Sequence, residues 1–360
     1  MRICLICVEI FAWGKYGGFG RATRLIGGAL AARGYQVAAV VPRRVGQAPV
    51  EDLDGITVYG YSASNPWSSI DLFRACDADI YHSSEPSFAT YLAQRAMPDR
   101  RHLITVRDPR DFEDWRMEFT LPSLSRLQVA ANYLFESNPL VSRAVRRADA
   151  VFSPAKSLSP KIKQLYRLPV EPAFLPTPVA VPETVAKAVH PTVCYLARLD
   201  RRKRPELFFD LAARFPDVRF VAIGASRDPA YERQLRETYA HLPNLEMAGF
   251  VDQFASSRHA DVLGESWVLV NTASREGLPN AFLEAAAHRC AVLSYVDPDG
   301  FASRFGYHAS TDDFAAGLET LLRDDAWRRL GGHGHRHVVE TFATDRAIDM
   351  HVAAYREALS

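Results

Sequence analysis

The sequence lacks any long apolar run, and nothing in its 360 residues approaches the ~20 apolar residues that a membrane span needs. Net charge is nearly absent as well: 43 basic and 42 acidic residues leave +1, so charge gives no reason to expect a nucleic-acid partner. The amino-terminal apolar run is only about nine residues long and has no small-residue cleavage site, which is typical of a buried strand rather than a signal peptide. We therefore expect a cytoplasmic protein.

Cysteine is scarce too. The five cysteines are Cys4, Cys7, Cys76, Cys194 and Cys290. Their odd number and apolar surroundings argue against a disulfide framework and favour reduced, buried thiols. Cys4 and Cys7 form a Cys-x-x-Cys pair, but positions i and i+3 of a strand point to opposite faces, which suits neither a shared metal nor a disulfide.

What the sequence does have is a regular alternation of apolar strand-like runs and amphipathic segments. The predicted strands are 3–8, 35–41, 78–82, 102–107, 149–153, 192–197, 218–224, 245–249, 267–272 and 291–295. The predicted helices are 20–33, 205–215, 231–241, 255–265 and 280–289, with more helix over 311–360. Near-continuous apolar strands separated by helices predict a parallel sheet covered on both faces.

Five prolines between residues 169 and 182 interrupt the alternation and predict a linker. We therefore expect an α/β protein with two Rossmann-like domains that face each other across a cleft. The expected domains are 1–178, 179–335, and a final helix, 336–360, that returns toward the first domain. In such folds ligands bind outside the carboxyl ends of the strands.

The strongest signal for a binding site is the segment from Ser274 to Glu284, Ser-Arg-Glu-Gly-Leu-Pro-Asn-Ala-Phe-Leu-Glu, which joins a strand end to a helix start. Gly277 allows a close backbone approach, Pro279 suits a first helical turn and Asn280 can cap one. The helix N-terminus is suited to a diphosphate, and the two glutamates of the segment are suited to sugar hydroxyls. A capped helix with a solvated glutamate is the alternative.

A second signal is the basic loop Arg198-Leu-Asp-Arg-Arg-Lys-Arg204, with five cations in seven residues. Arginine binds phosphate through two parallel hydrogen bonds and lysine acts as a point charge. A strand-end loop of this kind predicts a bound anion such as a diphosphate, whereas a solvated basic turn is the alternative.

A third signal is the glycine-rich segment Gly17-Gly18-Phe-Gly20 after the first strand. It fails the dinucleotide fingerprint, because the third glycine position holds Thr23 and no acidic residue follows the second strand. The pattern fits a loop that faces a ligand across the cleft better than it fits an NAD-dependent enzyme.

Together these features resemble the family-4 glycosyltransferases of the GT-B fold. Glu276 and Glu284 match the Glu-x7-Glu motif, Arg198 and Lys203 match the Arg/Lys diphosphate pair, and Gly17 and Gly18 match the glycine loop. The resemblance covers nearly the whole chain and is strongest over 192–296. It implies sugar transfer from a UDP-, GDP- or ADP-sugar, UDP being favoured, with retention of configuration and with no cofactor or metal.

The resemblance also implies roles for individual residues. The catalytic residues would be Glu276, which contacts the donor sugar, and Arg198 and Lys203, which stabilise the leaving diphosphate. Glu284 would contact the ribose. Backbone groups at Gly277, Leu278, Pro279 and Asn280 would hold sugar and phosphate, and Phe250 and Val251 would meet the base.

The sequence departs from the family where the acceptor is expected to bind. The stretch His82-Ser-Ser84-Glu85-Pro keeps the first histidine of a His-x-His-Glu-Pro pattern and replaces the second by Ser84, and the following strand ends in Arg107-Asp108. Polar groups at adjacent strand ends usually serve a ligand. We therefore predict acceptor binding by His82, Ser84, Arg107 and Asp108, with an acidic or hydroxyl-rich acceptor. An Arg–Asp pair that only ties the loop down is the alternative.

The candidate metal-binding patterns are Asp-x-Asp triplets at 52–54, 77–79 and 297–299, and the run His333-Gly-His335-Arg-His337. Such triplets arise by chance in a chain with 42 acidic residues, and the histidines lack the companions that metal clusters use. We expect no metal, and we place the histidine run at a helix start on a solvated face.

Segment 121–147 mixes apolar residues with Arg126, Arg143, Arg146 and Arg147, so it could lie on a membrane surface or pack on its own domain. The expected partners are a nucleotide-diphosphate sugar and a small-molecule, glycan or lipid-linked acceptor, with contact at the inner membrane surface in the lipid-linked case and no nucleic acid. A nucleotide-sugar binding protein without catalytic activity is the rival interpretation.

Overall fold

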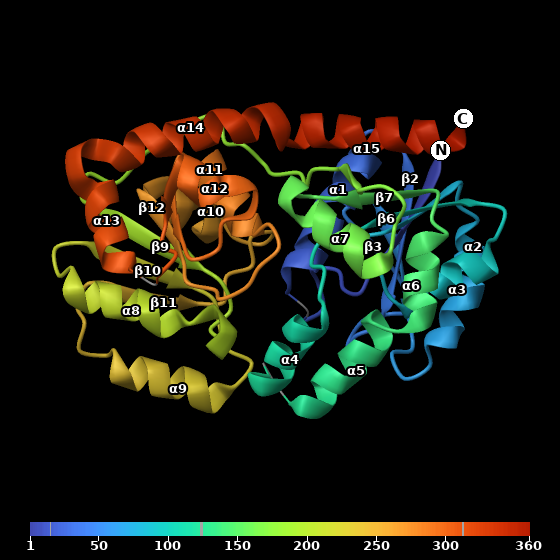
Figure 1. Ribbon diagram of the computed structural model, residues 1–360, viewed down its shortest axis with the longest axis horizontal. Helices are drawn as coiled ribbons and strands as arrows, with labels where there is room; N and C mark the ends of the chain where they lie inside the picture. Colours follow the sequence, from blue (N-terminus) through green and yellow to red (C-terminus); the bar gives the residue numbers. More distant parts are fainter. Residues whose placement is uncertain (15, 123–124, 312) are drawn as a thin grey trace. The chain divides into compact units, whose positions relative to one another are not determined.

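The computed structural model describes residues 1–14, 16–122, 125–311 and 313–360, and the chain folds into two compact units (Figure 1). The first unit contains Met1–Arg116, Leu127–Pro178 and Thr344–Ser360, and the second contains Met117–Arg126 and Val179–Ala343. Each unit is built on one mainly parallel sheet connected by helices, which confirms the α/β class and the two Rossmann-like sheets.

The sheet of the first unit has the strand order β3-β4-β2-β1-β5-β6-β7-β8. Its strands are β1 (Arg2–Ile6), β2 (Gln36–Pro42), β3 (Val50–Leu53), β4 (Ile56–Tyr61), β5 (Ile80–Ser83), β6 (Arg101–Thr105), β7 (Ala150–Ser153) and β8 (Ala173–Phe174). Its helices are α1 (Gly18–Ala32), α2 (Ser69–Cys76), α3 (Phe88–Ala96), α5 (Arg126–Glu136, without its first residue), α6 (Pro139–Arg146), α7 (Ser159–Tyr166) and α15 (Thr344–Leu359). Helix α4 (Phe112–Thr120) is divided between the two units after Arg116.

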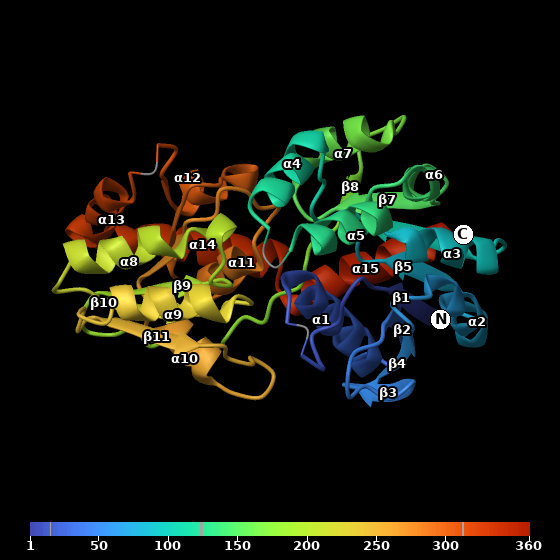
Figure 2. The ribbon, with the colours of Figure 1, turned by 90° about the horizontal axis from the view of Figure 1, so that it is seen from below.

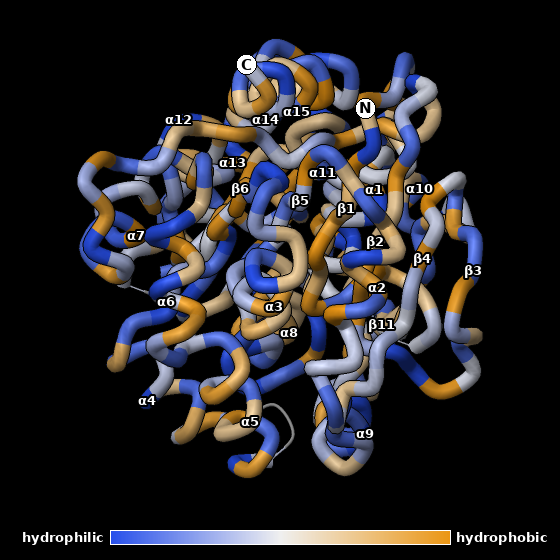
Figure 3. Tube along the Cα trace, turned by 90° about the vertical axis from the view of Figure 1, so that its right-hand side faces the viewer, coloured by the Kyte–Doolittle hydropathy of each residue, from blue (hydrophilic) through white to orange (hydrophobic). Residues whose placement is uncertain are grey.

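Alternate side chains of β1 supply two different cores, because successive strand residues point to opposite faces. Ile3 and Leu5 pack with α1 and α15, whereas Cys4 and Ile6 pack with α2 and α3. The tube in Figure 3 is correspondingly apolar along much of β1 and β6. The sheet is therefore covered by helices on both faces, as near-continuous apolar strands predict.

Helix α15 belongs to the first unit because its apolar stripe enters that core. Ile348, Val352 and Tyr355 are spaced for one helix face and pack against the residues of α1 and β1. Outside the core, the Arg33 guanidinium at the end of α1 contacts the carboxylates of Asp345 at 3.0 Å and Asp349 at 2.6 Å.

The sheet of the second unit has the strand order β11-β10-β9-β12-β13-β14, with parallel pairs throughout the described strands. Its strands are β9 (Thr192–Leu196), β10 (Arg219–Ile223), β11 (Leu245–Gly249), β12 (Val268–Asn271), β13 (Ala291–Ser294) and β14 (Gly306–His308). Its helices are α8 (Pro205–Arg214), α9 (Pro229–Thr238), α10 (Arg258–Glu265), α11 (Asn280–Ala287), α12 (Phe301–Phe305), α13 (Phe314–Leu322) and α14 (Ala326–Thr341).

Two local predictions need correction. The sequence reasoning missed the hairpin β3–β4, which lies beyond β2 at one edge of the sheet (Figure 2) and turns at Asp54 and Gly55, both with positive φ. The proline-rich stretch 169–182 is not linker throughout, because β8 lies inside it and pairs with β7.

The sequence predicts reduced, buried cysteines, and the structure describes all five. All five thiols are unbridged, and all but the half-buried Cys76 are buried. Cys4 and Cys7 belong to different cores, on opposite faces of the sheet, as expected for positions i and i+3 of a strand.

Candidate functional site

The basic loop after β9 is shaped by one of its own carboxylates. Asp200 accepts hydrogen bonds from the backbone N–H groups of Arg202 (3.1 Å) and Lys203 (3.3 Å), which starts the 3-10 turn η3 (Arg201–Lys203). The end of β10 approaches the loop closely: a Cβ on Gly224 would lie 1.9 Å from the carbonyl oxygen of Ala197. A larger residue would clash with this oxygen, and the φ of +150° at Gly224 is one that other residues rarely adopt.

The loop after β12 is joined directly to this basic loop. The Thr272 hydroxyl donates to the backbone carbonyls of Lys203 (2.5 Å) and Arg204 (2.9 Å), and the Arg204 Nε donates back to the Thr272 carbonyl at 2.6 Å. The Ser274 backbone N–H adds a bond to the Arg202 carbonyl at 3.1 Å. The structure thus brings together the two loops that the sequence singled out separately.

The side chains of Lys203 and Glu276 meet across this junction as an ion pair. Both are largely shielded from water, with exposed side-chain fractions of 18% and 21%. A shielded lysine next to a carboxylate is held in place, and its charge can be shared with an anion that arrives beside it.

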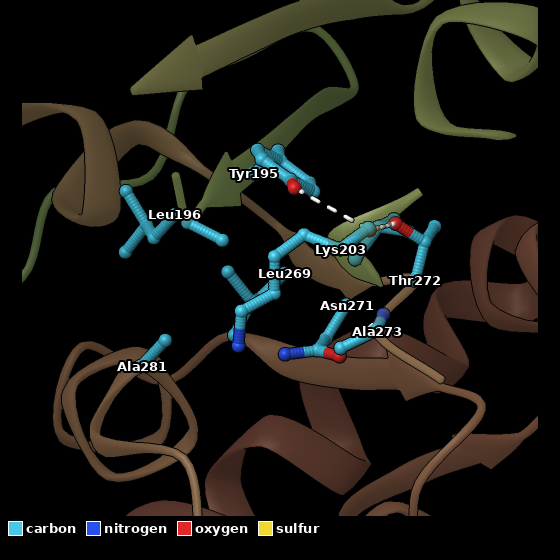
Figure 4. Close-up of a pocket in the computed structure, with 10 residues that line it drawn as sticks. Tyr195, Leu196, Lys203, Leu269, Asn271, Thr272, Ala273 and Ala281 are labelled. Atoms are coloured by element: carbon cyan, nitrogen blue, oxygen red, sulfur yellow. Dashed lines mark hydrogen bonds between the residues drawn. The ribbon is translucent and has the colours of Figure 1, made fainter. Parts of the chain in front are cut away.

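A pocket opens beside Lys203, at the carboxyl ends of β9 and β12 (Figure 4). The Tyr195 hydroxyl lies on one side of the Lys203 backbone and Thr272 on the other, while Ala281 comes from α11. The lining residues are Tyr195, Leu196, Ala197, Lys203, Leu269, Val270, Asn271, Thr272, Ala273 and Ala281. This is the position at which parallel α/β sheets bind ligands.

The cations of the basic loop have different surroundings. Arg201 lies over the ring of Tyr231, 4.4 Å from its centroid, and Arg204 lies over Tyr295 at 4.6 Å. Arg202 pairs with Glu118. Arg198 lies 3.6 Å from Asp200 and keeps 34% of its side chain exposed.

Helix α11 begins at Asn280, as the predicted helix 280–289 does. Pro279 is its buried N-cap residue, with extended backbone and no side-chain capping bond, and Asn280 is the first helical residue, so the capping role predicted for Asn280 is wrong. Gly277 and Leu278 are half-buried in the loop before it. Phe250 and Val251 directly follow β11, and Phe250 is 46% exposed.

Glu284 lies in α11 and is only 7% exposed. Its Oε2 lies 3.4 Å from Nε2 of His259, a residue of α10 that the sequence reasoning did not single out. The sequence signals His259 in one way: it is a polar residue on the same helix face as the apolar residues Val262 and Leu263, which is the face that an amphipathic helix buries.

The glycine-rich loop of the first unit is filled by the protein's own carboxylate. Gly17 is the N-cap residue of α1, and a Cβ there would lie 1.9 Å from Oε1 of Glu9. The Gly20 N–H donates to the same oxygen at 3.1 Å, and Glu9 is only 8% exposed. The glycine at position 17 is therefore accounted for by the close approach of an internal carboxylate to the helix N-terminus.

The four predicted acceptor residues lie at the ends of β5 and β6. Three of them, His82, Ser84 and Arg107, are buried and form hydrogen bonds within the first unit. His82 bonds through both ring nitrogens, to the Tyr355 hydroxyl and to the Thr105 hydroxyl, each at 2.8 Å. Burial lowers its pKa well below the usual value, so the ring is neutral. The Ser84 hydroxyl is within 3.3 Å of the Ile6 carbonyl.

Arg107 is also enclosed. Its guanidinium donates to the Ser84 carbonyl (3.1 Å) and to the Thr177 hydroxyl (2.5 Å), and its backbone N–H donates to Glu85 at 2.7 Å. Burial lowers the pKa of Arg107 to about 10 and raises that of Glu85 to about 8. Asp108 is less enclosed and pairs with Arg110 at 3.0 Å.

The candidate metal-binding patterns have structural partners. The Asp297 carboxylate accepts from the Ala302 backbone N–H at 2.7 Å, at the start of α12. The histidine run lies inside α14 rather than at a helix start, where His335 bonds to the Ala287 carbonyl and His337 stacks on Phe305. No group of three or more metal-ligating side chains occurs among the described residues.

Known protein families match both halves of the chain. The model of "Glycosyltransferase Family 4" matches residues 16–180, and that of "Glycosyl transferases group 1" matches residues 190–324. The chain belongs to family 4 of the GT-B glycosyltransferases, and it is a glycosyltransferase. The search of curated proteins gives no match.

Solved structures show the same fold at low identity. The chain is similar to sucrose-phosphate synthase from Thermosynechococcus elongatus (TM-score 0.74, 17% identity, 99% of this chain and 98% of that chain). It is also similar to HepE from Anabaena in complex with UDP and glucose (0.72, 12%, 98% and 99%). A third is the catalytic domain of starch synthase IV from Arabidopsis thaliana bound to ADP and acarbose (0.67, 13%, 99% and 99%).

Proposed function

We propose that this glycosyltransferase takes its sugar from a nucleotide diphosphate, a UDP-sugar in the first place, and binds the donor in the second unit. The observation that carries the proposal is the Lys203–Glu276 ion pair at the joined loops after β9 and β12. It puts a cation for the diphosphate next to a carboxylate that can accept hydrogen bonds from sugar hydroxyls. The complex of HepE with UDP and glucose supports a donor of this chemical class.

The predicted residues of the second unit have the following roles in this proposal. Arg198, Lys203 and the N-terminus of α11 stabilise the negative charge that develops on the leaving diphosphate. Glu276 orients the sugar, and Glu284 binds the ribose. The backbone from Gly277 to Asn280 contacts sugar and phosphate, and Phe250 and Val251 contact the base.

In the reaction, the bond between the anomeric carbon and the diphosphate oxygen breaks, and a bond from the acceptor oxygen to the same carbon forms. The acceptor hydroxyl gives its proton to the departing diphosphate. Attack from the face that the diphosphate leaves gives retention of configuration. No metal is required, because the two cations and the helix N-terminus supply the positive charge.

For the acceptor, we assign direct contact to Asp108, with His82, Ser84 and Arg107 holding the strand ends that carry it. Their internal hydrogen bonds favour that division of roles. The acceptor is a hydroxyl-bearing small molecule, glycan or lipid-linked sugar. The enzyme works in the cytoplasm.

A lipid-linked acceptor is favoured by exposed side chains of two successive helices. Leu127 and Leu134 of α5 are 84% and 67% exposed, and Arg143 and Arg146 of α6 and the following Arg147 are exposed as well. Apolar and basic side chains together suit an anionic bilayer surface. No helix in the described part of the chain combines the length and apolar content that crossing a membrane takes. Cosedimentation with anionic vesicles, compared between wild type and a Leu127→Ser, Leu134→Ser double variant, tests this contact.

The function is tested in two steps. First, UDP, GDP, ADP and NAD are compared by thermal shift, since a ligand at 100 times its Kd adds about 2.7 kcal/mol to the stability. Second, transfer or slow hydrolysis of the matching nucleotide sugars is followed in excess EDTA, and the anomeric configuration of the product is read by NMR. Binding without turnover supports the silent binding protein, and a shift with NAD alone contradicts the proposal.

A further inference from the structure

Helix α10 carries a histidine on the face that its apolar residues bury. His259, Val262 and Leu263 are the buried residues of this helix, and His259 is 8% exposed. Apolar side chains are the usual occupants of such a position. A buried imidazole at this position is expected to form a polar interaction, so the partners of its ring nitrogens are informative.

The Nε2 atom of His259 does not form a hydrogen bond within the described part of the protein. Among the described residues, this atom is buried and has no hydrogen-bond partner, although it lies 3.4 Å from Oε2 of Glu284. The distance is within range of an ion pair, but the alignment is not that of a hydrogen bond. A buried polar group without a hydrogen-bond partner lowers the stability of the fold. A ligand that draws the Glu284 carboxylate into line would recover that cost.

A second histidine, His288, also contacts Glu284, but at a different group. His288 Nδ1 bonds to the Glu284 backbone carbonyl at 2.8 Å and so supports the helix end. His259 instead approaches the Glu284 carboxylate, the group proposed above to bind the ribose. The two histidines contact the same residue with different consequences.

The position of His259 in the chain also fits a nucleoside. It follows β11 by ten residues, in the connection that begins with Phe250 and Val251, the proposed base contacts. The proposed ribose contact, Glu284, lies on α11 next to it. His259 thus links the segment that meets the base to the carboxylate that meets the ribose.

We propose that His259 is a positioning residue for ribose recognition, an inference that rests on the proposed function. Its Nε2–H donates to Oε2 of Glu284 when the nucleotide is bound. The carboxylate is thereby oriented so that its other oxygen accepts a hydrogen bond from a ribose hydroxyl. The site consequently selects ribonucleoside diphosphates over deoxyribonucleoside diphosphates.

The test compares the Kd of UDP with those of 2′-deoxy-UDP and 3′-deoxy-UDP by calorimetry. Loss of a hydrogen bond to a charged group costs about 1.5–3 kcal/mol, so wild type is expected to bind the poorer analogue at least tenfold more weakly than UDP. If UDP does not bind, the ADP or GDP series replaces it. If none of them binds wild type, the proposed function fails and the inference fails with it.

Two variants separate positioning from packing. The amide nitrogen of glutamine can occupy the place of Nε2, whereas that of asparagine corresponds to Nδ1. His259→Gln is therefore expected to keep the ribose preference within about threefold of wild type, and His259→Asn to reduce it to about threefold or less. If His259→Asn does not fold, His259→Leu takes its place with the same expectation.

The matched control is His288→Asn, which keeps a donor for the Glu284 backbone carbonyl and should leave the preference unchanged. A folded His259→Asn or His259→Leu variant with the wild-type preference would overturn the inference while leaving the proposed function intact. So would an equal loss in His259→Gln, since that result means that the ring packs rather than positions.

Discussion

Two helices of this protein, α1 and α11, each follow the carboxyl end of a strand, but different groups surround their N-termini. In the first unit, α1 starts at a glycine loop whose interior is occupied by the buried carboxylate of Glu9. In the second unit, α11 starts after a loop whose carboxylate, Glu276, pairs instead with Lys203 of the neighbouring basic loop. The first helix N-terminus has an internal anion, and the second is surrounded by groups suited to an external one.

Glycine spacing alone therefore does not identify a phosphate site. Gly17 is required by the close approach of Glu9, so an internal contact accounts for it. At α11, the positive charge of Arg198 and Lys203 and the pocket at the end of β12 are needed to make the case for a ligand. Substitutions in either unit can test this contrast, and the largest effect is expected at Glu276.

Glu276→Gln should reduce the rate of transfer most. The substitution preserves shape but removes the charge that binds sugar hydroxyls and holds Lys203, an effect of roughly 1.5–3 kcal/mol or about 10- to 100-fold. Steady-state kinetics with the preferred donor measure the loss, while UDP affinity should change little because UDP lacks the transferred sugar that Glu276 contacts. A folded variant with near-wild-type turnover would remove Glu276 from the catalytic site.

Arg198→Ala should weaken nucleoside diphosphate binding by about tenfold, since it removes a charge-assisted bond to phosphate. Arg201→Ala is the matched control: it removes an arginine of the same loop that lies over Tyr231. Calorimetric titration of both variants should show the loss only for Arg198. Equal losses would mean that the loop acts through its net charge and that Arg198 has no special position.

Glu9→Gln should destabilise the protein by about 1 kcal/mol, since it removes a negative charge from a helix N-terminus. Thermal unfolding measures this change, and UDP affinity should stay within about twofold of wild type. Tenfold tighter UDP binding in Glu9→Gln would contradict the contrast, because it would show that Glu9 competes with the donor for α1.

A further effect concerns the dependence of stability on pH. Burial lowers the pKa of His351 to about 4, and an exposed histidine has a pKa near 6.5. The unfolded chain therefore binds more protons, and the stability present above pH ~6.5 is lost as the pH falls toward 4, on the order of 3 kcal/mol in total. His351→Gln keeps a donor for the Pro176 carbonyl but does not titrate. Its unfolding temperature should therefore fall less between pH 7 and pH 5 than that of wild type, and an equal fall would contradict the assignment.

Much of this architecture could be predicted from the sequence, because its signals are local. The apolar strands and the loops after β9 and β12 follow from patterns of a few residues each. The hairpin at β3–β4 was also accessible, since Asp54-Gly55 between two short runs is a known hairpin signal. It was missed because its two strands are short and less apolar than the parallel strands around them.

The remaining errors come from contacts between residues far apart in the chain. His82 stands at a strand end that usually serves a ligand, but Tyr355, 273 residues later, takes one of its nitrogens. The position of Glu9 in the glycine loop and the approach of His259 to Glu284 likewise depend on the completed fold. Local sequence shows which residues end a strand, whereas only the packing shows which of them face a ligand.

The central claim is that the donor diphosphate binds the second unit, at the joined loops around Lys203. The most direct test is a calorimetric titration of UDP into Lys203→Met and Lys161→Met. Both substitutions remove a lysine that is paired with carboxylates, Glu276 in the second unit and Asp111 and Asp114 in the first. The account predicts at least tenfold weaker binding for Lys203→Met and an unchanged Kd for Lys161→Met. Wild-type affinity in a folded Lys203→Met variant, or an equal loss in both, would contradict it.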